Sequence, residues 1–102
     1  MLIHLKGRWP EQAVPDGEPL WLFYEVVEDR DVVTRTVEIF SGGLSLRNSV
    51  NLAERQGPDA RHPQNRSLAH GAFLDEARHW LEVISDAEFN RLWDTAADKP
   101  WP

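Results

Sequence analysis

Four histidines are the first candidates for a metal site or a general base. They are His4, His62, His70 and His79, and no two stand at the i, i+4 spacing that places two ligands on one helix face. The chain has no cysteine, which excludes disulfides, thiolate chemistry and zinc sites with sulfur ligands. We therefore predict no metal site and no cofactor, and we expect surface or half-buried histidines.

Two carboxylates, Glu25 and Glu38, interrupt strand patterns that are otherwise apolar or β-branched. If their strands pair around a turn at residues 28–31, Glu25 lies near Arg35 across the ladder. Such an opposite-charge pair contributes about 0.2–1 kcal/mol to the stability of a sheet. A role in acid or base catalysis would require a pocket and a raised pKa, and the sequence indicates neither. No catalytic residue is predicted.

Nucleophile and nucleotide motifs are also missing from the sequence. None of the serines lies in a G-x-S-x-G or S-x-x-K pattern, so a serine nucleophile has no support. Gly42-Gly43 lacks the glycine spacing and the lysine of a phosphate-binding loop. These observations leave binding as the function that the candidate residues favour.

A locally basic segment contains Arg55, Arg61 and Arg66. Residues 51–66 carry a net charge of +1, from three basic and two acidic residues, whereas residues 67–102 carry −4, from three basic and seven acidic residues. A charge-asymmetric surface of this kind can steer a protein partner, and a solvated loop explains it about as well.

Two tryptophans, Trp9 and Trp101, stand beside prolines near the ends of the chain. If their rings are exposed, they are candidates for an interface hot spot. The predicted binding residues are therefore these two tryptophans, the three arginines of the basic segment and the charged residues of the strands, namely Trp9, Trp101, Arg55, Arg61, Arg66, Glu25, Arg35 and Glu38.

Strands must position most of these residues. Dense strand-type patterning runs from Leu20 to Leu46, and Gly42-Gly43 favours a tight hairpin within it. In the segment 32–40, alternation places Val33, Arg35, Val37 and Ile39 on one face. The predicted strands are residues 2–9, 20–27, 32–40, 44–50 and 80–84.

The C-terminal part predicts a helix with a capping box. Ser85 is the expected N-cap and Glu88 stands three residues later, and Pro100 is the expected stop. A second, short helix is expected within residues 67–79, and residues 51–65 are expected to form a long surface loop. The predicted fold is α+β, with an antiparallel sheet of four or five strands and the C-terminal helix packed on one face.

Length and charge limit the classes of function. The 102 residues fit a single α+β domain, residues 1–102. A net charge of −6 disfavours binding to nucleic acid and docking on an anionic membrane. The first residues contain no apolar stretch long enough for a signal peptide or a membrane span, so we expect a cytoplasmic protein of unspecified oligomeric state.

The sequence also resembles a family of small uncharacterised bacterial domains. The resemblance lies in an N-terminal tryptophan, Trp9, a strand with Tyr24-Glu25, an R-x-V-E-I-F-x-x-G strand at 35–43 and an I-S-x-x-E-F-x-x-x-W helix at 84–93. It covers about two thirds of the chain in scattered blocks. This resemblance implies a bacterial α+β domain, and it implies no catalytic residue.

Three functions are consistent with these observations. The first is a binding module of the inhibitor or immunity type, which neutralises a protein partner through an acidic surface containing tryptophan. The alternative is a small-molecule-binding protein or minor enzyme with a pocket between sheet and helix, using Glu25, Glu38, Arg35 or His70. The third is a structural subunit that assembles through a sheet edge.

Overall fold

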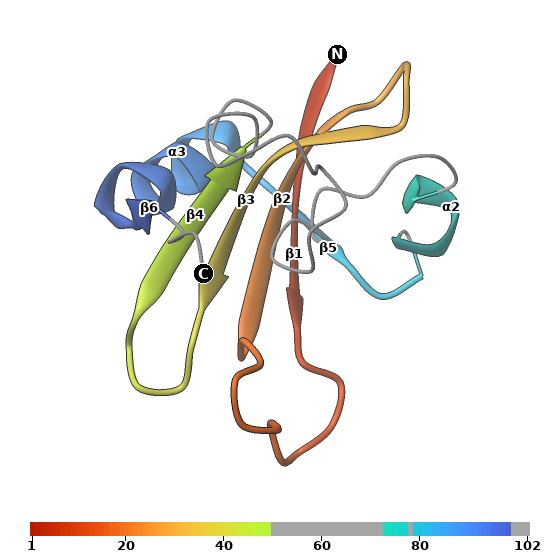
Figure 1. The fold of residues 1–102 in the computed structure, drawn as a ribbon. Helices are drawn as coiled ribbons and strands as arrows, with labels where there is room; N and C mark the ends of the chain where they lie inside the picture. Colours follow the sequence, from red (N-terminus) through yellow and green to blue (C-terminus); the bar gives the residue numbers. More distant parts are fainter. Residues whose placement is uncertain (50–72, 78, 99–102) are drawn as a thin grey trace, which may run out of the picture.

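The computed structural model describes residues 1–49, 73–77 and 79–98. Within these ranges the chain forms six strands and two helices, so the fold is α+β as predicted (Figure 1). In chain order the elements are β1 (Leu2–Arg8), β2 (Trp21–Val27), β3 (Val32–Ile39), β4 (Ser45–Ser49), α2 (Phe73–Ala77), β5 (Glu82–Ile84), α3 (Asp86–Thr95) and β6 (Ala97–Asp98).

The described strands form one sheet in the order β5-β1-β2-β3-β4-β6. Neighbouring strands are antiparallel except β4 and β6, which pair in parallel through Leu46–Ala97 and Arg47–Asp98. This corrects the prediction of a purely antiparallel sheet with four or five strands. Strand β6 has two residues, so it carries no alternation that a sequence pattern would reveal.

The register of β2 and β3 shifts by one residue at Thr34. Val26 pairs with Val33, but Glu25 pairs with Arg35, so Thr34 is the extra residue of a β-bulge. Because side chains alternate with a period of two, one extra residue exchanges the faces on either side of it. The prediction that Val33 and Arg35 share a face is therefore wrong. Val33 packs with Val26, and Arg35 lies beside Glu25.

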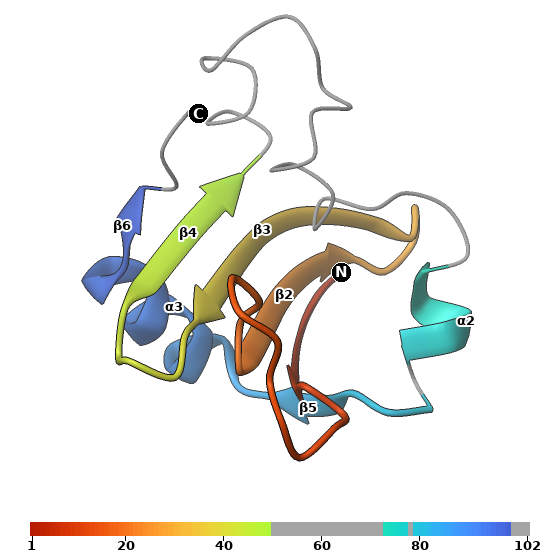
Figure 2. The same ribbon diagram turned by 60° about the horizontal axis from the view of Figure 1, so that its bottom comes forward.

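Each face of β2 packs against its own apolar core, as its two apolar faces predicted. One core contains Tyr24 and is closed by Leu74 and Ala77 of α2. The other contains Phe23 and is closed by Phe89 of α3. Figure 2 shows α3 on one side of the sheet, below β3 and β4.

Helix α3 begins where the capping box predicted. The Oγ of Ser85 accepts a hydrogen bond from the backbone N–H of Glu88 at 3.1 Å. The helix ends at Thr95, because Ala96 takes an extended conformation and the chain continues into β6. The predicted stop at Pro100 is therefore too late.

The other connections agree in part with the sequence patterns. Gly43 has a φ of 93° in the turn between β3 and β4, as the predicted hairpin requires. Of the helix expected within residues 67–79, the structure describes α2, whose Leu74 N–H donates to Asp31 Oδ1 at 2.9 Å. The loop expected at residues 51–65 lies outside the described residues.

Candidate functional site

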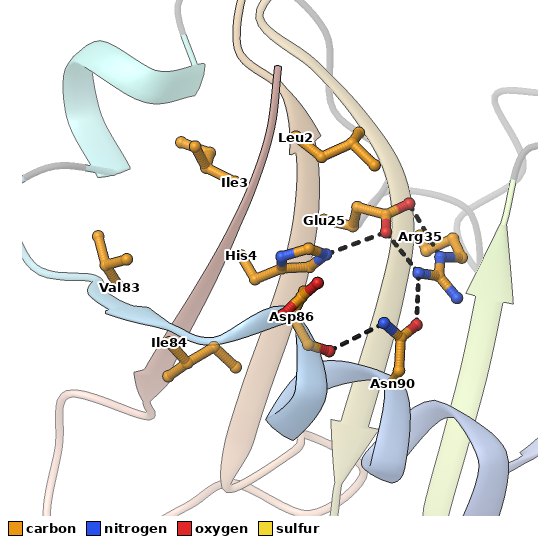
Figure 3. Close-up of a pocket in the computed structure, with 9 residues that line it drawn as sticks. All are labelled: Leu2, Ile3, His4, Glu25, Arg35, Val83, Ile84, Asp86 and Asn90. Carbon is orange, nitrogen blue, oxygen red and sulfur yellow. Dashed lines mark hydrogen bonds and ion pairs between the residues drawn. The ribbon is translucent and has the colours of Figure 1, made fainter.

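A cavity of about 390 Å³ opens where β5 ends beside β1 (Figure 3). Strand β5 pairs with β1 only from His4 to Lys6, because the chain turns at Ser85 into α3. The first residues of β1 extend past this end of β5 and form one side of the opening. The cavity is lined by Leu2, Ile3, His4, Glu25, Arg35, Val83, Ile84, Asp86 and Asn90.

Glu25 is the centre of a hydrogen-bonded network on the wall of this cavity. Its side chain is buried, and its Oε1 accepts hydrogen bonds from Thr34 Oγ1 and Arg35 Nε, both at 2.9 Å. Its Oε2 accepts a hydrogen bond from Arg35 Nη2 and contacts His4 Nε2 at 3.0 Å. Both carboxylate oxygens are therefore occupied twice, by groups from three residues.

The Glu25 carboxyl is held in its charged form. Burial alone raises its pKa, but the hydrogen bonds from Arg35, His4 and Thr34 and the charge of Arg35 together outweigh burial and lower the pKa from 4.5 to about 2. A carboxylate with such a pKa is a weak proton acceptor, and its oxygens are already engaged. Glu25 therefore organises its neighbours and does not act as a general base.

Arg35 is fixed by contacts on several sides. Its Nη2 also donates to Asn90 Oδ1 at 2.9 Å, and Asn90 Nδ2 donates to the backbone oxygen of Asp86 at 2.9 Å. The guanidinium carbon lies 5.0 Å from the ring centroid of Phe89 and 4.8 Å from that of Trp93. The network thus connects the sheet to the first turns of α3.

His4 contributes an oriented imidazole. An ionised carboxylate only accepts hydrogen bonds, so His4 Nε2 carries a proton and donates it to Glu25. The ring also packs against Phe89, with 4.9 Å between the centroids. His4 is buried, and its position is set by the pairing of β1 with β2 and by its contact with Phe89 of α3.

Asp86 stands at the rim of the cavity, in the first turn of α3. Its side chain is exposed, and its carboxylate points toward His4 in Figure 3. Among the residues that the structure describes, no hydrogen bond or ion pair engages this carboxylate; the bond to Asn90 uses the backbone oxygen. Its charge is therefore available to a ligand.

The remaining wall is apolar. Ile3 and Ile84 are half-buried, whereas Leu2 is 52% exposed and Val83 is 71% exposed. Leu2 and Ile84 lie on the face of the sheet that carries the network, whereas Ile3 and Val83 point toward the opposite face (Figure 3). The cavity therefore combines an apolar side with a polar, charged side.

The structure unites two of the predicted binding residues and separates a third. Glu25 and Arg35 form the ion pair that the sequence predicted. Glu38 is buried on the opposite face of the sheet near Tyr24, whose pKa rises to about 12 through burial and through the negative charge of Glu38. Glu38 therefore does not belong to the cavity, since its alternation in β3 directs it away from Arg35.

The other predicted residues do not contribute to the cavity either. Trp9 follows the far end of β1 and is half-buried, and its buried Nε1 has no hydrogen-bond partner among the described residues. Four other predicted binding residues lie outside the described residues, namely Arg55, Arg61, Arg66 and Trp101. The predicted polar group His70 also lies outside them.

Sequence reasoning missed three polar residues of the cavity, His4, Asp86 and Asn90. The sequence places no other candidate residue near His4. The pairing of β1 with β2 brings His4 opposite Glu25, and no local sequence pattern encodes this pairing. Asp86 and Asn90 are four residues apart in α3, so the sequence could predict that they share a helix face. The sequence could not predict that this face lies against Arg35, because that depends on tertiary packing.

No group of three or more His, Cys, Asp or Glu side chains within the described part of the chain is arranged to hold a metal ion. In the same part of the chain, neither helix has the length and apolar character needed to cross a membrane. Comparison with known proteins found no matching family model, no matching curated protein and no matching solved structure. The function must therefore be inferred from the geometry and chemistry of the cavity.

Proposed function

We propose that this protein binds a small organic molecule in the cavity between β1, β5 and the start of α3. The observation that supports this proposal is the His4–Glu25–Arg35 network on one wall. Its members hold one another in fixed positions, so a ligand meets a wall that is already organised. This is the second of the functions expected from the sequence, a small-molecule site between sheet and helix.

Size and composition support the same proposal. A volume of about 390 Å³ falls within the range of about 300–1,000 Å³ that is usual for ligand sites. Such sites combine apolar walls with a few fixed polar groups, as Leu2 and Ile84 do here with the network and Asp86.

Binding without catalysis fits the charge states better than an enzyme does. The low pKa of Glu25 makes it a poor base, and its fourfold occupation leaves it no lone pair directed at a substrate. His4 donates one ring N–H to Glu25 and is buried. The network therefore serves to position a ligand.

A fragment screen followed by ¹H–¹⁵N NMR tests this proposal. Fragments that bind should shift the amide signals of residues 2–4, 83–86 and 90. The variant Leu2→Trp places a large ring at the mouth of the cavity and should abolish these shifts, because Leu2 is exposed and its side chain lies on the same face as the network. Leu44→Trp is the matched control, since Leu44 is also exposed but lies in the turn before β4.

Two results would contradict the proposal. One is that no fragment shifts the amide signals around the cavity. The other is that Leu2→Trp leaves the shifts unchanged, because binding would then occur elsewhere. A loss of shifts in both variants would point to a general effect of the added tryptophan.

A protein-binding module, of the inhibitor or immunity type, is the second candidate. Leu2 and Asp86 are exposed at the rim of the cavity, and the chain carries a net charge of −6. A basic partner with an apolar side chain would suit this surface. Recovery of one protein from a host lysate by the wild type, and not by Leu2→Trp, would favour it.

The remaining expectations rest on the sequence. They are the cytoplasmic location, the absence of nucleic-acid binding and the resemblance to a bacterial domain family. Fractionation of the native host and a gel-shift assay with DNA and RNA would test the first two.

A further inference from the structure

We infer that the ligand of this cavity is an amphipathic organic cation, with an ammonium group against Asp86 and an apolar tail on Leu2 and Ile84. This inference rests on the proposed function, because it specifies the chemistry of the same cavity. It follows from the charges that line the cavity and from the position of the apolar wall (Figure 3).

The charges of the network cancel within it. Glu25 and Arg35 form a bidentate ion pair, so together they present no net charge to the cavity. No side chain among the described residues forms an ion pair with the Asp86 carboxylate, so its negative charge is not neutralised. The partial positive charge at the start of α3 offsets its charge only in part, since it amounts to about half an elementary charge. The site therefore favours a cation.

An anionic ligand has fewer groups to bind. The Nε and Nη2 groups of Arg35 are already donating to Glu25 and Asn90. An anion at the mouth would also stand near the Asp86 carboxylate, and like charges at short range repel each other. A guanidinium in the wall therefore does not make this an anion site.

The apolar side chains define where the tail lies. The half-buried Ile84 and the exposed Leu2 lie on the same face of the sheet as the network. An aliphatic tail that covers Leu2 and Ile84 removes apolar surface from water on both partners, at about 25 cal/mol for each Å² buried. The polar and apolar halves of the ligand thus meet different sides of the same cavity.

Three probes with the same six-carbon tail test this inference, namely hexylammonium, hexanol and hexanoate. NMR titrations of the cavity amide signals would give their affinities. We expect hexylammonium to bind about fivefold more tightly than hexanol, because it can form one ion pair with Asp86 at the exposed rim. Hexanoate should bind most weakly. Asp86→Asn should abolish the preference for hexylammonium over hexanol.

The matched control is Glu88→Gln, which removes the same charge from the same turn of α3 outside the cavity lining. It should keep the preference for hexylammonium. Equal affinities for the three probes, or tighter binding of hexanoate, would overturn the cation assignment and leave the proposed pocket standing. If neither these probes nor any fragment shifts the cavity signals, the proposed function fails as well.

Discussion

Glu25 organises the polar wall of the cavity through the hydrogen bonds that its carboxylate accepts. The carboxylate lies on the face of β2 that looks toward α3, where it accepts hydrogen bonds from Thr34, Arg35 and His4. Burial of a charge is costly unless partners surround it, and here they surround it completely. The same contacts that stabilise the charge prevent Glu25 from acting as a base.

Removing the charge of Glu25 should destabilise the fold. Glu25→Gln leaves the Arg35 guanidinium without its counter-ion and weakens the hydrogen bond from His4. We expect the free energy of unfolding to fall by about 2–4 kcal/mol in urea denaturation. Glu18→Gln, at an exposed position in the loop before β2, should change it by less than about 0.5 kcal/mol. A similarly small change for Glu25→Gln would contradict the network.

The same residue predicts a pH dependence. The pKa of Glu25 is lowered by folding from 4.5 to about 2, so the folded state favours the charged form. The contribution to stability is complete above pH 4.5 and is lost as the pH falls toward 2, and it amounts to about 3 kcal/mol. Urea denaturation of the wild type and of Glu25→Gln across this window measures it. If the difference between them stays constant as the pH falls, the pKa assignment is wrong.

The sequence predicted that Glu25 lies near Arg35, but the simple register on which that prediction rested does not bring them together. Counting back from the turn at residues 28–31 in simple register places Thr34 opposite Glu25 and directs Arg35 to the other face. The bulge at Thr34 brings Arg35 to the face of Glu25. Nothing in the local sequence marks a bulge there, because Thr34 is an ordinary strand residue with strong β propensity.

At the scale of elements, the close approach of residues 80–81 to β1 keeps β5 in place. A methyl group on Gly7 would stand 2.2 Å from Leu81 Cδ2 and 2.7 Å from the ring of Trp80. Leu81 is buried and cannot move freely, although Trp80 is half-exposed and can. Gly7 is thus required at this point of β1.

Gly7→Ala should therefore destabilise the protein. We expect a loss of about 1–3 kcal/mol in thermal or urea unfolding, as is usual when a packed site receives an extra group. Because β5 forms one side of the cavity, the amide signals of Val83 and Ile84 should shift more than those of β4. Gly42→Ala is the control, since nothing lies within 4 Å of the added methyl group. Equal stability of the two variants would show that residues 80–81 adapt freely.

Most of the strands and helices could be predicted from the sequence. The four long strands and the capped helix α3 follow from alternation, turn glycines and the Ser85 capping box. The two-residue β6 was missed because it is too short for a pattern. The early end of α3 was missed because it depends on the pairing of β6 with β4, which is a long-range interaction.

At the scale of the whole molecule, the site exists because segments distant in sequence meet. His4 comes from β1, Glu25 and Arg35 come from β2 and β3, and Asn90 comes from α3. The order β5-β1-β2-β3 brings them together, and the short β5 leaves the cavity open beside β1. Strand order is a tertiary property, which explains why individual residues were predicted more easily than the cavity.

The central claim is that the cavity between β1, β5 and α3 is a ligand site. Isotope-edited NOE spectroscopy on the complex with the tightest-binding fragment tests it most directly, because NOEs report contacts shorter than about 5 Å between the fragment and individual methyl groups. We expect NOEs from the fragment to the methyl groups of Leu2 and Ile84. NOEs to methyl groups elsewhere, with none to these two residues, would contradict the claim.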